Sequence, residues 1–579
     1  MRTPHSSLLF PPPGSDGRPG LWIALGAALA AVGVRAVIAC LTGFTNEDAL
    51  ITLRYAENLA AGRGFVYNPG EPVLGTTTPL YTLFLALGVR LGLPALATGK
   101  VVCILADGGL CLAAWAWGRA WGREDVGRLA AVCVAAGPLH IRWAISGMET
   151  SLVALGCALV WLAWFRGRER TTWALLALLF LLRWDTAVLA LLLLGGSVVR
   201  ERRAPWRGLG LFLVLVLPWL VFSTLEFGSP LPGTARAKWI VYSHSPPGTL
   251  FPASRPLWLR VVTDPAYAVV ILLAVSGVAC GRGGAKGEGQ RAKGGVSHLA
   301  PPLSRNELRG VSGERGADSF LTARNSFLAG GGLPLLWVVG YYGLLAVSPV
   351  PVFEWYLVPP LLVVELAAAA GCLGLLRWVC GPDAPYARRS GSVPAFLVPF
   401  AVRLASPARR IVSVFLPAVV VVLALRHAGG AAARTQAIEN RLRRPLGLWL
   451  RQHARPGDRV MLEPIGYIGY YSGLRVLDVV GLVSPEVLPF WRHGAPGPLW
   501  ELARAFRPEW CVLRPTELLH IRRAGGEPWE QEYRRETTFS YRRAGDPEPF
   551  TFHVYRRAGT GLPGGRAGRR PLPVPPADR

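Results

Sequence analysis

A long series of apolar segments limits the possible folds of this chain more than any other feature of its sequence. A membrane span needs about 20 apolar residues, and lipid offers the backbone no hydrogen bonds, so such segments form helices. Some of the segments reach this length and others are shorter. We therefore predict a polytopic α-helical membrane protein with about 10–12 membrane helices. The apolar runs lie at 21–41, 76–93, 99–118, 127–141, 150–165, 171–182, 186–199, 208–226, 265–280, 332–349, 355–376 and 411–425.

Composition supports a membrane protein and argues against a nucleic-acid partner. Of the 579 residues, 51% are hydrophobic and 17% are charged, whereas a soluble domain carries about 25% charged residues. The net charge of +26 is spread over short clusters between apolar runs, such as 166–170 and 200–203. Such clusters are typical of cytoplasmic loops. The nine cysteines include no C-x-x-C pair, so neither a zinc site nor a disulfide framework is indicated.

Basic loops also predict how the chain is divided and oriented in the cell (inner) membrane. Within the membrane domain, 43–75 is expected to be the first external loop, and the Gly/Arg-rich stretch 281–325 a disordered cytoplasmic loop. The predicted regions are a cytoplasmic tail at 1–19, a membrane domain at 20–426, an extracytoplasmic α/β domain at 427–557 and a disordered tail at 558–579.

Two details of this topology can be tested. The short runs 171–182 and 186–199 are predicted to form a hairpin with Arg183-Trp-Asp185 at its outer tip. The loop 43–75 should be outside and the Arg-rich loop 119–128 inside, but two full spans between them would place both on one side. We therefore predict that 76–93 or its neighbour does not cross the membrane fully.

Residues 430–557 are predicted to form a soluble α/β domain. Residues 431–453 have a helical pattern, and three short apolar runs separated by turn signals are predicted to be strands. The runs are Arg459–Leu462, Arg475–Asp478 and Trp510–Leu513.

The most informative stretch is Thr45–Tyr81, which follows the first span. Thr45 or Asn46 can cap a helix, and Glu47 and Asp48 suit its positive end. At 3.6 residues per turn, Glu47 shares a face with Arg54 and Asn58, opposite an apolar face. This pattern predicts an amphipathic helix at the membrane surface. It leaves two interpretations open, an ordinary interfacial helix with a solvated acidic cap or a site built on two adjacent carboxylates.

The same stretch resembles the first external loop of bacterial GT-C-type glycosyltransferases, in the group of arabinofuranosyltransferases and RgtA/B/C/D-like mannosyl- and galacturonosyltransferases. Later segments extend the resemblance over roughly residues 20–515. The matching elements are Glu47-Asp48-Ala-Leu-Ile51, Arg54-Tyr55, Asn58, Gly62-Arg-Gly64, Asn68-Pro-Gly-Glu71, Gly75-Thr-Thr-Thr-Pro-Leu80, Ser146-Gly-Met-Glu-Thr150, Arg183-Trp-Asp185, 227–234 with Lys238, Trp355-Tyr356-Leu357 with Pro359, Gly466-Tyr-Ile-Gly469 and Asp478-Val-Val-Gly-Leu482.

Four positions depart from the pattern of this group. Glu47 replaces the commoner first Asp, Leu50 replaces Tyr and Trp184 replaces Pro, and these three changes keep the ionisable groups of the motifs. Gly233 replaces Asn, which puts one polar contact in doubt.

The resemblance implies a GT-C-like fold and a transferase that moves a sugar from a polyprenyl-phosphate donor to a glycan, lipid or protein hydroxyl on the extracytoplasmic side. Asp48 is the expected base, with Glu47 as runner-up. Lys238, Arg54 and Arg183 are candidates for the leaving phosphate, and Glu149 and Asp185 for sugar hydroxyls or for holding those cations. We expect no cofactor and no bound metal, with metal dependence left open. The remaining candidates for substrate binding are Asn58, Thr234, Trp355 and Tyr356.

Each assignment has a simpler alternative. Arg183 and Asp185 can form only an ion pair, and Glu149 can only cap a helix. Lys238 can extend along the membrane interface, and Trp355 with Tyr356 can be interfacial anchors. For the whole chain, the alternatives are a transporter or flippase of lipid-linked sugars and a non-catalytic glycan-binding subunit. The lone histidines His140 and His553 are given no role.

Overall fold

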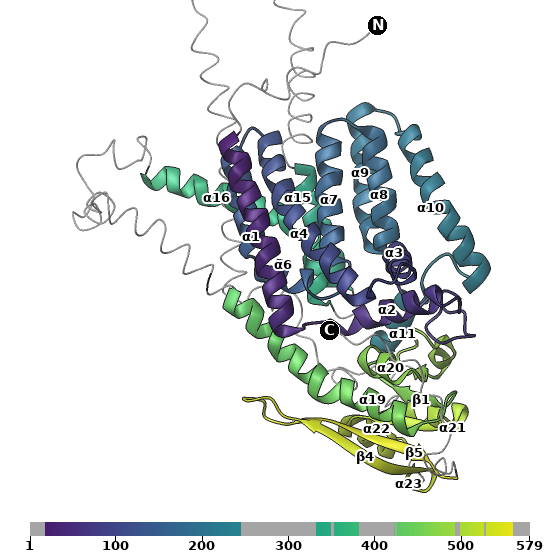
Figure 1. Cartoon of the computed structure of the whole chain (residues 1–579). Helices are drawn as coiled ribbons and strands as arrows, with labels where there is room; N and C mark the ends of the chain where they lie inside the picture. Colours follow the sequence, from purple (N-terminus) through teal and green to yellow (C-terminus); the bar gives the residue numbers. More distant parts are fainter. Residues whose placement is uncertain are drawn as a thin grey trace, which may run out of the picture.

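The computed structural model consists of a helical bundle and a smaller sheet-containing domain at one end of it (Figure 1). The structure describes residues 18–244, 332–348, 352–380, 422, 425–491, 498–525 and 529–559. The apolar run 265–280, most of the run 411–425, the loop 281–325 and nearly all of the predicted tails 1–19 and 558–579 lie outside these residues.

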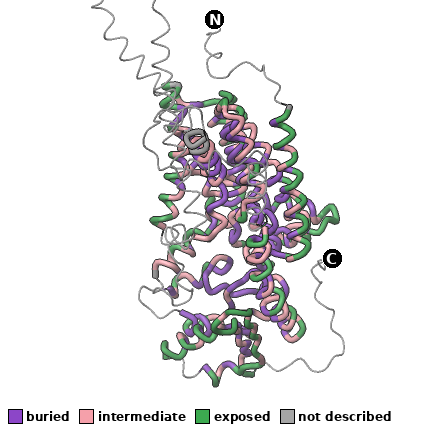
Figure 2. Tube along the Cα trace, turned by 90° about the vertical axis from the view of Figure 1, so that its left-hand side faces the viewer, coloured by how far each residue is buried: buried purple, intermediate pink, exposed green. Residues whose placement is uncertain are grey.

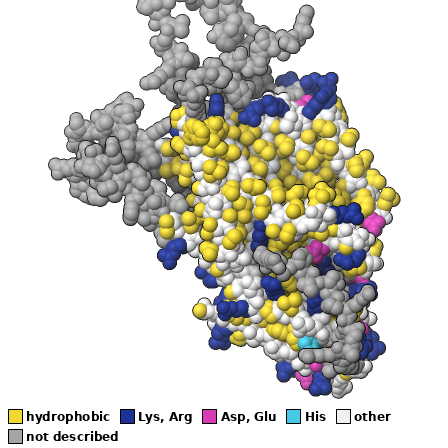
Figure 3. Space-filling view, viewed as in Figure 1, with side chains coloured by type: hydrophobic (Ala, Val, Ile, Leu, Met, Phe, Trp, Pro, Cys, Tyr) yellow, Lys and Arg dark blue, Asp and Glu magenta, His cyan; other side chains and the backbone are white. Residues whose placement is uncertain are grey.

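Apolar side chains cover the outer surface of the bundle between more basic ends (Figure 3). Among the described residues, α1, α4 and α10 are long and apolar enough to cross a membrane. Leu213, Val214 and Leu225 of α10 are exposed, as expected for a helix that faces lipid. The bundle contains α1 (Arg18–Thr42), α3 (Pro79–Arg90), α4 (Ala95–Ala120), α5 (Glu124–Ala136), α6 (Pro138–Ala144), α7 (Thr150–Phe165), α8 (Glu169–Leu182), α9 (Ala187–Glu201), α10 (Trp206–Phe227), α15 (Gly332–Val347) and α16 (Leu361–Cys380).

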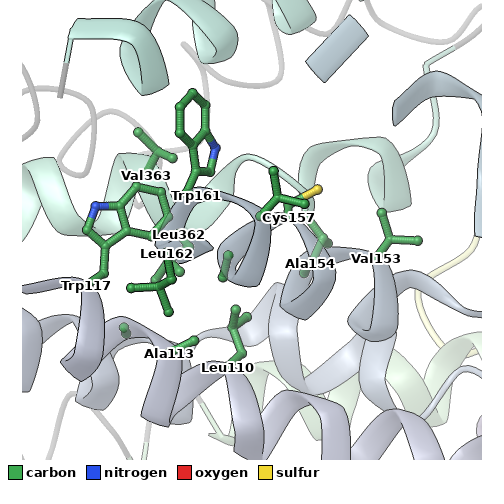
Figure 4. Packing of buried hydrophobic residues seen from close by; sticks show 14 of the residues in the cluster. Leu110, Ala113, Trp117, Val153, Ala154, Cys157, Trp161, Leu162, Leu362 and Val363 are labelled. Carbon is green, nitrogen blue, oxygen red and sulfur yellow. The ribbon is translucent and has the colours of Figure 1, made fainter. Parts of the chain in front are cut away.

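The inside of the bundle is packed by aromatic and small side chains, and the buried residues run through its centre (Figure 2). Trp117 of α4 lies 6.2 Å from Trp161 of α7, measured between ring centroids. Small residues such as Ala113 and Ala154 let these helices approach (Figure 4). Close packing of this kind fixes the helix ends, and therefore the loops that carry polar residues.

The structure refines several predicted spans. Helix α3 has 12 residues and a length of about 18 Å, against about 30 Å of hydrocarbon. This length fits the prediction that 76–93 or its neighbour does not cross the membrane fully, which stays a prediction. The run 127–141 is broken at Pro138 into α5 and α6. The run 355–376 is interrupted between the short helix η2 (Glu354–Leu357) and α16, where Pro359 and Pro360 have no backbone N–H to continue a helix.

A buried ionic cluster inside the bundle corrects the prediction for His140. Its Nε2 lies 3.2 Å from Glu365 of α16, and its Nδ1 lies 3.4 Å from Asp107 of α4. Asp107 also pairs with Arg35 of α1 at 2.5 Å. Ionisable groups in the apolar interior of a membrane protein pair with one another. This cluster ties together four helices that are far apart in the sequence.

The C-terminal domain contains a five-stranded sheet of order β2-β1-β3-β5-β4. Strands β1 (Arg459–Leu462), β2 (Arg475–Asp478) and β3 (Trp510–Leu513) have the predicted bounds, and β1 pairs with both others in parallel. The antiparallel strands β4 (Tyr533–Tyr541) and β5 (Phe550–Arg557), which extend the sheet beyond β3, were not predicted.

Successive strand residues alternate between two cores because the side chains of a strand point to opposite faces. One face packs on α19 (Arg444–His453), α20 (Tyr467–Ser472) and the first loop of the bundle. The other packs on α21 (Leu499–Phe506), α22 (Pro515–Arg523) and the short helix η4 (Pro485–Phe490). A continuous helix enters α19 from residue 425 through the π-helical turn η3 (Glu439–Arg443), in agreement with the helix predicted at 431–453.

Helix α2 (Glu47–Ala60) lies between the bundle and the C-terminal domain (Figure 1). Asn46 caps it, and its side chain accepts a hydrogen bond from the N–H of Asp48 at 2.9 Å. Most of the helix is buried. The interpretation of an ordinary interfacial helix with a solvated polar face is therefore wrong, because the face that includes Arg54 and Asn58 is covered by protein. The position of α2 at the membrane surface stays a prediction.

Arg54 provides the main polar contact of this interface. Its guanidinium donates hydrogen bonds to the carbonyl oxygens of Tyr67, Gly469 and Leu474 at 2.9, 2.6 and 2.6 Å. It also lies 4.1 Å from the centroid of the Tyr67 ring. Two of the three carbonyls belong to the C-terminal domain, so this one side chain joins the first loop to that domain.

Two glycines of the C-terminal domain allow the close approach. A Cβ atom at Gly466 would lie 2.2 Å from the carbonyl oxygen of Glu47, and one at Gly469 would lie 2.1 Å from the hydroxyl of Tyr67. The motif Gly466-Tyr-Ile-Gly469 therefore has a steric function at the interface.

We expect Arg54→Lys to lower the stability of the folded chain. A lysine cannot reproduce the planar fork of donors, and each buried carbonyl left without a partner costs about 1–3 kcal/mol. Thermal unfolding of the purified protein in detergent should show a Tm several degrees below that of Arg63→Lys, a matched change at an exposed side chain. Equal Tm values for the two variants would contradict the role given to Arg54.

Candidate functional site

A cavity of about 290 Å³ lies where α2, the loop ends of the bundle and the C-terminal domain meet. Eight of the eleven side chains predicted from the sequence line this cavity, although they come from five separate segments of the chain. They are Asp48, Glu149, Arg183, Asp185, Thr234, Lys238, Trp355 and Tyr356.

Asp48 enters the cavity from the first turn of α2. Thr52, one turn later, lines the same wall with Thr76 and Thr78. The Thr76 hydroxyl lies 3.0 Å from that of Thr78 and 3.5 Å from that of Thr52. The cavity wall around Asp48 is therefore rich in hydroxyl groups.

Arg183 occupies the tip between α8 and α9, as the predicted hairpin requires. Its Nε donates to Asp185 at 3.0 Å, and its Nη2 pairs with the same carboxylate. Its guanidinium also lies 5.1 Å from the centroid of the Tyr356 ring. Within the described part of the chain, Nη1 is buried without a hydrogen-bond partner and lies 4.0 Å from Glu149. Arg183 is thus held on one side and keeps a donor for an anionic ligand.

Helix α11 (Gly233–His244) contributes Thr234 and Lys238, one turn apart, to the cavity lining. The hydroxyl of Thr234 is buried and has no partner among the described residues. The Nζ of Lys238 lies 5.4 Å from the centroid of the Phe353 ring. Two cationic side chains, from different segments, therefore face one small space.

Aromatic rings close the side of the cavity next to η2. Trp355 stacks on Phe353 with centroids 4.4 Å apart and packs edge-on against Trp143. Trp184, at the tip of the α8–α9 hairpin, also lines the cavity. Rigid aromatic walls with a few polar groups are typical of small-molecule sites.

The other three predicted residues lie outside the cavity lining. Glu47 pairs with Arg443 at 3.1 Å and accepts a hydrogen bond from the N–H of Tyr467. Asn58 donates to the carbonyls of Val66 and Tyr67. With Arg54, these side chains bind the protein itself, so the structure gives Arg54 and Asn58 structural contacts where the sequence suggested contacts with substrate.

The motif Asp478-Val-Val-Gly-Leu482 shapes one edge of the cavity. The carboxylate of Asp478 accepts hydrogen bonds from the N–H groups of Val480, Leu482 and Val483. This turn places Leu482 in the cavity wall. Asp478 is thus a positioning residue of the loop.

Sequence reasoning missed several contributors to the site. The threonines of Gly75-Thr-Thr-Thr-Pro-Leu80 line the cavity, and their motif was the available signal. Arg443, which pairs with Glu47, gave no signal because its partner is 396 positions away. In the described residues, no group of three His, Cys, Asp or Glu side chains is arranged to hold a metal ion.

Comparison of the sequence with known proteins gives one family model and one relative. Residues 432–555 match a family model described as a domain of unknown function, DUF8728. A terminal β-(1→2)-arabinofuranosyltransferase of Mycobacterium tuberculosis is 28% identical over 260 residues, which cover 39% of this chain. The chain spans 41% of the length of that relative.

Solved structures give a match over nearly the whole chain. ArnT from Cupriavidus metallidurans in the apo state is similar with a TM-score of 0.52 at 14% identity, covering 92% of this chain and 97% of ArnT. ArnT from the same organism bound to undecaprenyl phosphate gives a TM-score of 0.50 at 14% identity, and the match covers 93% of this chain and 98% of ArnT. The chain has a GT-C-type fold. The archaeal oligosaccharyltransferase AglB from Archaeoglobus fulgidus, in complex with an inhibitory peptide and a dolichol-phosphate, shares it with a TM-score of 0.50 at 13% identity, covering 94% of this chain and 75% of AglB.

The GT-C fold and the arabinofuranosyltransferase relative confirm the resemblance drawn from the motifs. The apolar helices fit an integral membrane protein of this fold. The fold also explains why polar motifs hundreds of residues apart meet at one end of the bundle.

Charges in the cavity act on one another. Burial raises the pKa of Asp48, with Lys238 opposing and Glu463 adding to the shift. Burial raises the pKa of Glu149 to about 7, although Arg183 opposes it. For Asp185 burial is outweighed by Arg183 and Tyr341, so its pKa is lowered. Near neutral pH the cavity therefore holds an ionised Asp185 and a Glu149 close to its midpoint.

The raised pKa of Glu149 predicts a pH-dependent stability. The folded chain keeps this proton up to about pH 7, whereas the unfolded chain loses it near 4.5, so the free energy of unfolding falls as pH rises between these values. The loss is about 3 kcal/mol at most. In Glu149→Gln, the Tm measured from pH 4.5 to 8 should fall less steeply than in the natural chain. In the control variant Glu486→Gln, which changes an exposed side chain, Tm should fall with pH as in the natural chain. If the curve of Tm against pH for Glu149→Gln ran parallel to that of the natural chain, the raised pKa of Glu149 would be contradicted.

Proposed function

We propose that this chain is a membrane glycosyltransferase that moves a sugar from a polyprenyl-phosphate donor to a hydroxyl of a cell-envelope acceptor. The observation that carries the proposal is the meeting of Asp48 with Arg183 and Lys238 in one small cavity at the end of an apolar bundle. A base and two cations are the groups that such a transfer needs.

The reaction is a single displacement at the anomeric carbon. Asp48 accepts the proton of the acceptor hydroxyl, whose oxygen forms the new bond to the sugar. The bond between the anomeric carbon and the phosphate oxygen breaks, and the polyprenyl phosphate leaves with the electron pair. Attack from the face opposite the phosphate inverts the anomeric centre.

The leaving phosphate is bound by Lys238 and Arg183. Arg183 keeps Nη1 for this contact because Asp185 and Tyr341 hold its other nitrogens. Glu149, with its raised pKa, and Thr234 hydrogen-bond the donor sugar, and Trp355 and Tyr356 cover its apolar faces. Asp48 is preferred to Glu47 as the base because Glu47 is engaged by Arg443.

The donor is lipid-borne, so the cavity must open near the membrane surface. We infer that this surface is the extracytoplasmic one, with the C-terminal domain outside and the N-terminus in the cytoplasm, because basic loops cluster at the opposite end of the bundle. The acceptor is a glycan, a lipid or a protein hydroxyl.

Two other functions are less consistent with the site. A transporter carries its site near the membrane midplane between repeats, whereas this cavity lies at one end of the bundle beside the C-terminal domain. A non-catalytic glycan-binding subunit needs no base, and the following prediction separates it from an enzyme.

We expect Asp48→Asn to lower sugar transfer at least about 100-fold, because an amide cannot accept the proton. The assay uses purified membranes and synthetic polyprenyl-phosphate donors that carry arabinofuranose, mannose or galacturonic acid. In the natural chain the rate should rise with pH through a pKa above that of a free aspartate, because burial raises the pKa of Asp48. A stronger loss in Glu47→Gln than in Asp48→Asn would reverse the assignment of the base.

Lys238→Gln should weaken binding of undecaprenyl phosphate by about 10-fold, because one charge-assisted contact to phosphate is lost. Binding is measured by quenching of the intrinsic tryptophan fluorescence of the detergent-solubilised protein. The matched control is Lys100→Gln, which changes a lysine outside the cavity lining. If both variants bound the lipid phosphate as the natural chain does, Lys238 would have no part in the phosphate site.

A further inference from the structure

The cavity is small for a site that must bind both a donor and a glycan acceptor. Ligand pockets have volumes of about 300–1,000 Å³, and this one, at about 290 Å³, is at the lower end. If the proposed function holds, a donor sugar and its phosphate fill most of this space. The part of a glycan acceptor beyond its reacting hydroxyl must then bind outside the cavity, on a neighbouring polar surface.

The parallel part of the sheet presents such a surface. The carboxyl ends of β1, β2 and β3 lie at one edge because these strands are parallel, and ligands of open α/β sheets bind outside this edge. Glu463 directly follows β1 and Arg514 directly follows β3. The loop after β2 contributes Leu482 to the cavity wall, so this edge of the sheet adjoins the cavity.

Glu463 and Arg514 form an ion pair at this edge. The Nη2 of Arg514 contacts both Glu463 and Glu517, the latter at 2.8 Å. The side chain of Glu463 is 17% exposed, so its carboxylate is held in place but still accessible. Its charge is among those that raise the pKa of Asp48.

Helix α11 connects this pair to the cavity. Thr234, Lys238 and Tyr242 follow at intervals of four residues and share one face of the helix, and the first two line the cavity. Tyr242 extends the row by one turn. Burial raises the pKa of Tyr242, and the charges of Glu463 and Asp48 add to the shift. Val241, on the adjoining face, is buried in the core of the C-terminal domain and fixes the helix.

We propose that Glu463 and Tyr242 form an acceptor subsite for a neutral glycan, with Arg514 as the positioning residue of the Glu463 carboxylate. A carboxylate accepts hydrogen bonds from sugar hydroxyls, and a tyrosine ring covers the apolar face of a sugar while its hydroxyl bonds at the edge. The negative charge of Glu463 disfavours a second phosphate at this place, which separates acceptor binding from donor binding. The subsite binds a sugar unit next to the one that supplies the reacting hydroxyl.

The test is a comparison of two-substrate kinetics with the full chain in detergent. The donor is the polyprenyl-phosphate sugar accepted by the natural chain, and the acceptors are mono- and trisaccharides of arabinofuranose, mannose and galactose. Glu463→Gln and Tyr242→Phe should each raise the KM of the trisaccharide about 10-fold, because a polar contact is lost. The donor KM and donor hydrolysis by water should stay within about 3-fold of the natural values. Glu509→Gln is the matched control, because Glu509 pairs with Arg557 at the other edge of the same sheet.

Several outcomes would overturn the subsite. One is an unchanged trisaccharide KM in both variants, and another is an increase in donor KM equal to that in acceptor KM. The subsite is also contradicted if the natural protein hydrolyses the donor but transfers the sugar to none of the saccharides, although the donor chemistry then stands. If the natural protein consumes no donor at all, the proposed function is contradicted instead. In that case saturation-transfer NMR with the same trisaccharides tests the subsite. Binding to the natural protein that is lost in Glu463→Gln supports the subsite, and no binding to the natural protein rejects it.

Discussion

The arrangement of the molecule depends on the docking of α2 against the C-terminal domain, and Arg54 is the centre of that contact. A buried guanidinium is tolerated only where its donors find acceptors, and two of its three carbonyl acceptors belong to the domain. Helix α2 therefore has its stable position only when the domain is in place. Because the same helix carries Asp48 into the cavity, the polar site is a product of the interface between the two parts.

The two adjacent acids at the start of α2 show how one helix serves both purposes. Neighbouring residues of a helix point about 100° apart. Glu47 is thereby directed to Arg443 and to the N–H of Tyr467, and Asp48 to the cavity. One carboxylate fixes the beginning of the helix against the C-terminal domain, and its neighbour faces the cavity. The pair thus combines a structural acid with the acid that we propose as the base.

Sequence patterns predicted the parts of this structure that depend on local order. The bounds of β1–β3 followed from short apolar runs between turns, whereas β4 was hidden because most of its residues, including Arg534 and Arg535, face solvent. Motif spacing indicated Asp48, Glu149, Arg183 and Lys238, but no local pattern could tell that Arg54 binds carbonyls more than 400 positions away. His140 was misjudged for the same reason, since its partner Glu365 lies 225 positions away.

The charges of the cavity suggest how donor binding and proton transfer are coupled in the proposed reaction. Lys238 lowers the pKa of Asp48, while burial and Glu463 raise it. When Lys238 contacts a phosphate, its positive charge is shared with that anion, so it stabilises the Asp48 carboxylate less. The pKa of Asp48 then rises, and Asp48 becomes the stronger base at the moment when donor is present. When phosphate leaves, Lys238 again favours the ionised form, and the proton taken from the acceptor is released to water.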